Sequence, residues 1–178
     1  MFFIAYLPIF LYLLLEFYRS SPVKEEKQNS GSSFFIGAVL ALMIIIPEIM
    51  YFFTINKVNS FLFFGVIVGL IGVWIRFSSM KTLERFYSRN VGMQGEHKLI
   101  QSGLYNYIRH PGYLGSFLTF LGVAISSSSF IAIIINIFLF FLAYLYCIKV
   151  EERTLVTLFG EQYKQYQSKT WRIIPFLY

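Results

Sequence analysis

The sequence contains no aspartate, a single cysteine and few charged residues of any kind. Of its 178 residues, 13% are charged, about half the share of an ordinary soluble domain. In contrast, 57% are hydrophobic and 20% are aromatic. A soluble domain of this size could not bury so much apolar surface. The composition therefore excludes an ordinary soluble enzyme, a nucleic-acid-binding module and a disordered chain, and it predicts an integral membrane protein.

The missing residue types also exclude several kinds of site. All the acids are glutamates, which excludes paired catalytic aspartates, a Walker-B aspartate and an EF-hand calcium loop. Cys147 alone can form neither an intramolecular disulfide nor a thiolate zinc site, and we predict no bound metal. The formal net charge of +6 fits the basic cytoplasmic face of a membrane protein better than a nucleic-acid site.

Five apolar segments predict an all-α, polytopic integral membrane protein with about five transmembrane helices. A helix needs roughly 20 apolar residues to cross a hydrocarbon core ~30 Å thick. The segments are Met1–Phe17, Phe34–Phe53 (interrupted by Pro47), Phe61–Phe77, Pro111–Ile125 and Phe130–Ile148. Apolar residues repeat at helical spacing beyond the fifth segment, so we expect this helix to continue into the cytosol and to end at Gly160.

The basic residues predict the orientation. Every Lys and Arg except Lys57 falls within residues 19–33, 76–110 and 149–178, which lie on one side of a five-helix arrangement. Basic loops stay cytosolic, so we expect the N-terminus outside and the C-terminus in the cytosol of a cell membrane or endomembrane. We divide the chain into residues 1–77, with three helices, and residues 78–178, with a cytosolic loop, two helices and a cytosolic tail.

The loop ends in the first of two unusual segments, LIQSGLYNYIRHPGYLG at residues 99–115. Pro111 favours the first turn of a helix. His110 would then lie at or near the N-cap, beside unpaired backbone N–H groups that favour an anion or a ligand oxygen. Gly112 and Gly115 let a flat ring or a substrate approach the backbone. The structural alternative is a helix start within an interfacial belt of Tyr and Arg.

The second segment is EERTLVTLFGEQYKQY at residues 151–166. Two adjacent carboxylates at a membrane interface repel each other and lose hydration, so at least one of Glu151 and Glu152 needs a cation. Either Arg109 or Lys149 could supply that cation, or it could be the ammonium group of a ligand. The sequence leaves these alternatives open.

Two features within the apolar segments have structural explanations. Glu48 is an intramembrane acid, which is a functional candidate by default, but it lies near the outer end of its helix and we favour a structural role. Gly65, Gly69 and Gly72 form a face of small residues in the third segment, which predicts close packing against another helix.

Taken together, the two segments resemble the isoprenylcysteine carboxyl methyltransferase family, within a wider group that includes phospholipid methyltransferases. The resemblance covers residues ~85–175. It implies S-adenosylmethionine as the cofactor, a cofactor pocket at the cytosolic mouth of a small helical bundle, and a lipophilic acceptor that enters from the bilayer. The chain has no Gly-rich Rossmann loop, so the usual site of soluble methyltransferases is excluded.

The resemblance also implies site residues. The cofactor-binding residues are Gln94, His97, Lys98, Leu99, Ile100, Tyr105, His110, Pro111, Gly112, Tyr113 and Glu151. Of these, Glu151 would hold the amino group of the cofactor. We predict Glu152, His110 and Arg153 as the catalytic residues, because a neutral acceptor needs a base and Arg153 is one of the nearest cations.

One position departs from the family pattern. In the prenylcysteine enzymes an arginine four residues before the first Glu pairs with the substrate carboxylate, whereas this chain has Cys147 there. A thiol does not replace a bidentate guanidinium group. We therefore predict O-methylation of a hydroxyl or carboxyl group on a long-chain lipid, and we favour an uncharged oxygen.

Three alternatives remain at this point. The first is a phospholipid N-methyltransferase that acts on amines of the phosphatidylethanolamine type. The second is an NADPH-dependent membrane reductase, because some sterol reductases share a similar C-terminal half. The third is a non-catalytic membrane subunit or small transporter.

Overall fold

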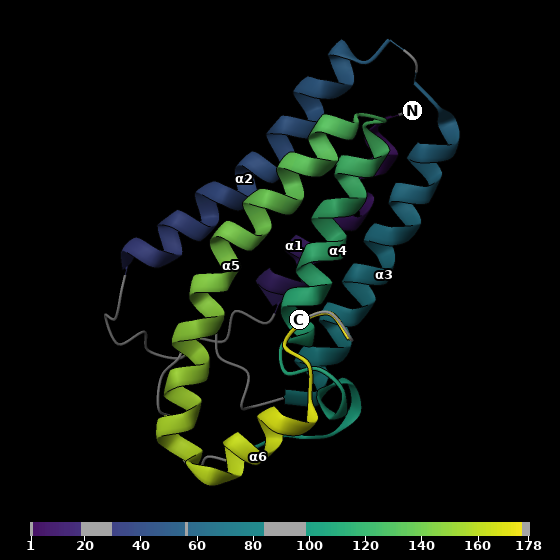
Figure 1. Ribbon diagram of the computed structural model, residues 1–178. Helices are drawn as coiled ribbons and strands as arrows, with labels where there is room; N and C mark the ends of the chain where they lie inside the picture. The colour runs from purple at the N-terminus through teal and green to yellow at the C-terminus, as the bar shows by residue number, and fades with distance from the viewer. Residues whose placement is uncertain (1, 19–29, 56, 84–98, 176–178) are drawn as a thin grey trace.

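The computed structural model describes residues 2–18, 30–55, 57–83 and 99–175, and the regular elements in this part of the chain are all helical. The elements are η1 (Phe2–Tyr6), α1 (Leu7–Tyr18), α2 (Ser30–Phe53), α3 (Asn59–Leu83), η3 (Gly103–Asn106), α4 (Pro111–Ser126), α5 (Phe130–Phe159) and α6 (Glu161–Lys169). Helices α1 to α5 form a bundle, and α6 lies at one end of it (Figure 1). The predicted all-α class is confirmed.

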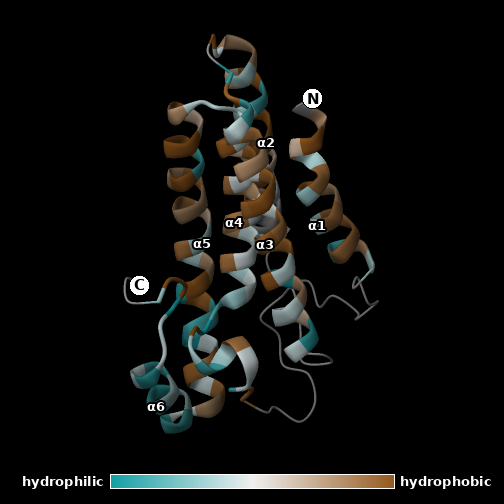
Figure 2. Ribbon diagram, turned by 90° about the vertical axis from the view of Figure 1, so that its right-hand side faces the viewer, coloured by the Kyte–Doolittle hydropathy of each residue, from teal (hydrophilic) through white to brown (hydrophobic). Residues whose placement is uncertain are grey.

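Three helices, α2, α3 and α5, are long and apolar enough to cross a membrane, whereas α1 and α4 are shorter apolar helices. Apolar residues dominate the bundle, and polar residues gather on α6 and the adjoining segments (Figure 2). Many large apolar side chains, such as Trp74 and Phe138, are exposed on the outside of the bundle. This pattern is typical of a lipid-facing surface.

Helices α3 and α4 make the most extensive contact in the bundle, and glycines on both helices permit it. A Cβ atom on Gly72 would lie 2.6 Å from the carbonyl oxygen of Gly115, and one on Gly115 would lie 2.6 Å from the backbone nitrogen of Arg76. Gly65 and Gly69 also face α4. The predicted close-packing face on the third apolar segment is therefore confirmed.

The predicted helix ends are also confirmed. Pro111 occupies the first turn of α4, with His110 as the N-cap residue. Helix α5 continues well past its apolar part to Phe159 and ends at Gly160, whose φ of 53° favours glycine. At its other end, the hydroxyl of Ser129 accepts a hydrogen bond from the backbone N–H of Ala132, which caps the helix.

The expected interruption at Pro47 does not occur, because α2 runs through this residue as one helix. A proline lacks the N–H that would bond the carbonyl four residues earlier, which here belongs to Met43. The side-chain amide of Asn136, on α5, donates to that carbonyl at 3.3 Å. The residue after Pro47 in α2, Glu48, accepts a hydrogen bond from the hydroxyl of Tyr6 in η1. Side chains of neighbouring elements thus satisfy polar groups inside the bundle.

Candidate active site

The first unusual sequence segment pairs through its backbone with the chain that follows α6. The N–H of Arg109 donates to the carbonyl of Trp171 at 2.8 Å, and the N–H of His110 donates to the carbonyl of Arg172 at 3.0 Å. In return, the N–H of Trp171 donates to the carbonyl of Tyr107 at 2.9 Å. These bonds fix the chain that precedes α4 against the chain that follows α6 (Figure 1).

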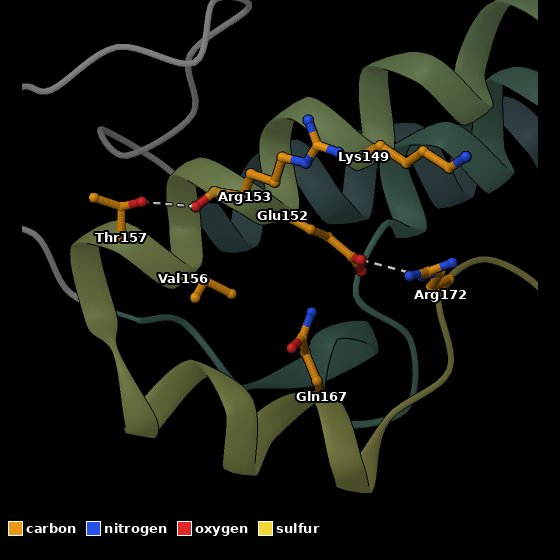
Figure 3. Close-up of a pocket in the computed structure, with 7 residues that line it drawn as sticks. All are labelled: Lys149, Glu152, Arg153, Val156, Thr157, Gln167 and Arg172. Carbon is orange, nitrogen blue, oxygen red and sulfur yellow. Dashed lines mark hydrogen bonds and ion pairs between the residues drawn. The ribbon is translucent and has the colours of Figure 1, made fainter.

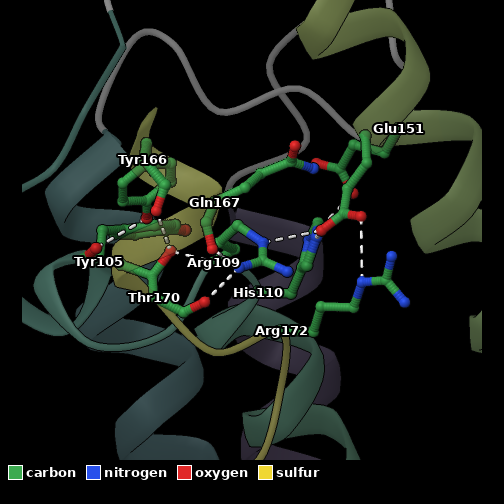
Figure 4. A network of polar contacts seen from close by, with 9 residues as sticks. Tyr105, Arg109, His110, Glu151, Tyr166, Gln167, Thr170 and Arg172 are labelled. Carbon is green, nitrogen blue, oxygen red and sulfur yellow. Dashed lines mark hydrogen bonds and ion pairs between the residues drawn. The ribbon is translucent and has the colours of Figure 1, made fainter. Parts of the chain in front are cut away.

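His110 lies between the two adjacent acids of α5, and Figure 4 labels His110 and the first of these acids, Glu151. Its Nδ1 atom is 3.4 Å from Oε2 of Glu151, and its Nε2 atom is 3.4 Å from Oε1 of Glu152. The imidazole is buried and makes no capping hydrogen bond to α4. The histidine ahead of α4 and the twin acids of α5 therefore belong to a single site, although more than 40 residues separate them in the sequence.

Glu152 is held by two arginines as well as by His110. Nε of Arg109 donates to Oε1 at 2.8 Å, and Nε of Arg172 donates to Oε2 at 3.1 Å. Arg109 also donates to the carbonyl oxygens of Gln167 and Thr170. Of the alternative cations for the acids, Arg109 is the one that pairs with Glu152. The carboxylate thereby joins α5 to the segment before α4 and to the segment after α6.

Glu151 has a different environment. Its side chain is partly exposed, and its Oε2 atom is buried and forms no hydrogen bond of good geometry with the described residues. A buried carboxylate oxygen without a hydrogen bond is costly unless a ligand supplies one. The amino group of a zwitterionic cofactor is a donor of the required type and charge. Glu151 could therefore hold the ammonium group of such a cofactor.

The charge of His110 depends on these acids. Burial alone would lower the pKa of His110, but the carboxylates of Glu151 and Glu152 raise it, and the net shift is upward from the usual value of 6.5. The imidazole therefore stays protonated to a higher pH than a free histidine. In this form both ring nitrogens carry a proton, and the positive charge of the ring lowers the repulsion between the twin acids.

Aromatic rings continue from His110 into the bundle. The rings of His110 and Tyr113 are stacked, with centroids 5.5 Å apart and planes 14° apart. The ring of Tyr113 in turn lies 5.0 Å from that of Tyr144 on α5. Such faces can hold a flat or apolar group. The site thus has charged groups toward the polar end of the molecule and aromatic groups toward the bundle.

The other predicted site residues divide into several groups. Gln94, His97 and Lys98 lie outside the described residues. Leu99 and Ile100 are partly buried, and Tyr105 is buried next to α6, where its carbonyl accepts a hydrogen bond from the hydroxyl of Tyr166 at 2.7 Å. Pro111, Gly112 and Tyr113 follow His110 in the first turn of α4.

Arg153 lies apart from the His110–Glu151 contact. Together with Lys149 it lines an open cavity of about 440 Å³ that is bounded by α5, α6 and the segment after α6 (Figure 3). No group of three or more His, Cys, Asp or Glu side chains within the described ranges could hold a metal ion.

Two ion pairs were not predicted. Arg172 binds Glu152, and Arg76 of α3 binds Glu16 of α1 at 2.7 Å. Neither arginine belongs to a recognisable motif, and each meets its partner only through tertiary structure. The sequence offered one signal for such pairs. An arginine within or beside an apolar segment needs an acidic partner, so its presence predicts an ion pair without identifying the acid.

Comparison with known proteins identifies the family of this chain. The family model for phospholipid methyltransferases matches residues 60–162, more than half of the chain. The chain belongs to the phospholipid methyltransferase family. This match includes all of α4 and α5, the first polar segment at residues 99–115 and residues 151–162 of the second.

Relatives of this family point to one branch of it. A protein-S-isoprenylcysteine O-methyltransferase from Saccharomyces cerevisiae is 26% identical over 94% of this chain and 76% of its own length. One from Schizosaccharomyces pombe is 30% identical over 60% of this chain and 46% of its own length. The resemblance to isoprenylcysteine carboxyl methyltransferases is therefore confirmed. The chain spans about half the length of the Schizosaccharomyces pombe protein.

A solved structure shares the fold. The eukaryotic intramembrane Ras methyltransferase, an isoprenylcysteine carboxyl methyltransferase, matches with a TM-score of 0.72 at 23% identity. The match covers 96% of this chain and 62% of the solved chain. The family, the shared fold and the apolar helices identify an integral membrane protein.

Proposed function

We propose that this protein is an integral membrane methyltransferase that transfers the methyl group of S-adenosylmethionine to an oxygen of a lipophilic acceptor from the bilayer. One observation carries the proposal: His110, ahead of α4, and Glu151, on α5, converge to 3.4 Å at the polar end of an apolar bundle. Membership of a methyltransferase family supplies the reaction class.

Different residues of the site would bind the ammonium group, the carboxylate and the apolar part of the cofactor. Glu151 would accept hydrogen bonds from the cofactor's ammonium group through its buried Oε2 atom. The first turn of α4 supplies the backbone N–H of Gly112 and the positive end of a helix dipole for the carboxylate, whereas Pro111 has no N–H to offer. Tyr113 would line the apolar side of the donor. Bound here, the cofactor supplies an electrophilic methyl carbon.

The chain's own contribution to the reaction is alignment, exclusion of water and control of protons. Protonated His110 keeps both acids in place and is itself buried between them. We assign Glu152 to this positioning role, because Arg109 and Arg172 already neutralise its charge. A carboxylate held by two guanidinium groups is a weak base, so Glu152 is poorly suited to deprotonate an acceptor.

Two features indicate the methyl acceptor: the apolar outer surface of the bundle and the residue at position 147. Cys147 on α5 donates a weak hydrogen bond to the carbonyl of Ala143 at 3.3 Å and brings no positive charge. We therefore favour a hydroxyl or carboxyl oxygen on a long-chain lipid, with an amine of the phosphatidylethanolamine type as the alternative.

The proposal includes a topology. Five membrane-embedded helices, an external N-terminus and a cytosolic C-terminus place the site at the cytosolic face. In this arrangement, residues 1–77 serve mainly as membrane support and residues 78–178 carry the methyl-transfer region.

The test is a transfer assay with the full chain purified in detergent. Isotope-labelled S-adenosylmethionine is supplied with three acceptors: a long-chain alcohol or phenol, a prenylcysteine carboxylate and phosphatidylethanolamine. Mass spectrometry then shows which acceptor gains a methyl group. Label in an O-methyl product supports the proposal, whereas label only in the amine transfers the assignment to N-methylation. No transfer from S-adenosylmethionine to any membrane-lipid extract would refute it.

A further inference from the structure

The open cavity beside the site has a marked excess of positive charge. Its lining contains three cations, Lys149, Arg153 and Arg172, and one acid, Glu152 (Figure 3). This acid already pairs with Arg172 at 3.1 Å and with Arg109 at 2.8 Å. The cavity therefore offers uncompensated positive charge in a concave space, a combination that favours an anion.

Lys149 and Arg153 supply most of this excess. Both are exposed, and within the described ranges no carboxylate lies within 4.0 Å of either cation. They lie four residues apart on α5, so their side chains project on the same side of the helix. Thr157, one further turn along, and Gln167 of α6 add hydrogen-bonding groups to the lining. Phosphate oxygens accept hydrogen bonds from all of these side-chain types.

The position of the cavity along α5 corresponds to the headgroup level of a bilayer. A hydrocarbon core ~30 Å thick takes up roughly 20 helical residues, and α5 begins at Phe130. Counted from there, the helix leaves the hydrocarbon close to Lys149. Lys149 and Arg153 are therefore the first cations that a lipid phosphate would meet on this helix.

An apolar stripe leads along α5 to the two cations. Leu142 and Tyr146 are 51% and 64% exposed. The spacing of four, three and four residues from Leu142 through Tyr146 and Lys149 to Arg153 places all of them on one face of the helix. Acyl chains can pack on the first two side chains while the headgroup reaches the last two. A free anion would make no use of this stripe.

We propose that this face of α5 binds an anionic phospholipid, with its phosphate in the cavity at Lys149, Arg153 and Arg172 and its acyl chains along Leu142 and Tyr146. This lipid is distinct from the methyl acceptor and from the cofactor. Because Arg172 also holds Glu152, the bound phosphate would lie directly beside the site and brace the segment after α6.

Native mass spectrometry of the full chain in neutral detergent tests the proposal. Phosphatidylglycerol and phosphatidylcholine with identical acyl chains are titrated in parallel, and inorganic phosphate is a third arm. We expect phosphatidylglycerol to bind at least tenfold more tightly than phosphatidylcholine. Each basic residue near an anionic headgroup contributes roughly 1 kcal/mol, so the double variant K149Q/R153Q should weaken phosphatidylglycerol binding about thirtyfold.

Two further variants separate the cavity from general charge. The double variant K164Q/K169Q removes the same charge from α6, outside the cavity lining, and should bind as the wild type does. The variant T157W keeps the charge but fills the cavity, and it should weaken phosphatidylglycerol binding without changing phosphatidylcholine binding. Binding of S-adenosylhomocysteine is measured for every variant, which separates this site from the proposed cofactor site.

Several outcomes would overturn the proposal. Equal binding of the two lipids, or an equal loss in the K164Q/K169Q control, would leave no role for the cavity. Inorganic phosphate binding as tightly as phosphatidylglycerol would make this an anion site without a lipid. Displacement of phosphatidylglycerol by S-adenosylhomocysteine would assign the cavity to the methyl donor.

Discussion

Replacement of Glu152 by alanine should destabilise the protein more than it disturbs the chemistry. The side chains of Arg109 and Glu152 are only 8% and 6% exposed. Removal of one partner from such a buried pair leaves an uncompensated charge and costs about 3–5 kcal/mol. Arg109 keeps its bonds to the carbonyls of Gln167 and Thr170, so we expect the lower end, about 3 kcal/mol.

This free energy corresponds to a large shift in melting temperature. For a chain of 150–250 residues, 1 kcal/mol corresponds to about 2–4 °C, so E152A should lower the apparent Tm by roughly 6–12 °C. Differential scanning fluorimetry in detergent measures this shift directly. The matched control is E161A, because Glu161 is 78% exposed and pairs with Lys164, which is itself exposed. Such surface pairs contribute little, and we expect an unchanged Tm.

The same variant separates the two possible roles of Glu152. If Glu152 positions the site, E152A should lose both thermal stability and affinity for S-adenosylhomocysteine, and lower temperature should restore part of the transfer activity. An E152A protein that melts with the wild type and binds S-adenosylhomocysteine normally, yet transfers no methyl group, would refute this reasoning. Glu152 would then be the base.

Three other predictions concern packing, the proline in α2 and pH. G115V should lower Tm by several degrees because a side chain there meets α3, whereas G37V, where a Cβ has nothing within 4 Å, should not. N136A should cost about 1 kcal/mol, and less in a P47A background, because an alanine N–H can bond the freed carbonyl; equal costs in a double-mutant cycle would contradict the contact. Since the pKa of His110 is raised, its stabilisation is complete below about pH 6.5 and is lost as pH rises through the folded-state pKa. Melting curves should show this loss in the wild type, and a loss of equal size in H110Q would assign it to another group.

Local signals in the sequence predicted much of the fold. The lengths of the apolar runs identified the principal helices, Pro111 predicted the start of α4 and Gly160 predicted the end of α5. The glycine face predicted the α3–α4 contact. Each of these signals acts within a few residues or within one helix face, and tertiary structure does not override it.

The unpredicted features depend on partners that are distant in sequence. Pro47 was expected to interrupt a helix, but Asn136 supplies a hydrogen bond to the carbonyl that the proline frees. The pairing of Arg172 with Glu152 requires the chain after α6 to return alongside the segment before α4. Periodicity and composition carry no information about such contacts.

In the candidate site, too, the residues could be predicted from local motifs, whereas their pairing could not. The sequence predicted Glu152, His110 and Arg153 as catalytic residues and Glu151 as a cofactor ligand. The structure brings His110, Glu151 and Glu152 together, whereas Arg153 lines the neighbouring cavity. The sequence left open which acid has a protein cation as its partner. Three-dimensional geometry distinguishes them, since Arg109 and Arg172 hold Glu152, whereas Glu151 contacts His110.

Isothermal titration of S-adenosylhomocysteine into the purified protein tests the central claim most directly. The wild type should bind, E151Q should lose at least tenfold in affinity because the ammonium group loses its charged partner, and E161Q should match the wild type. All three proteins should melt within a few degrees of one another. Undiminished binding by a folded E151Q protein would contradict the claim that the carboxylate of α5 and the histidine ahead of α4 form the cofactor site.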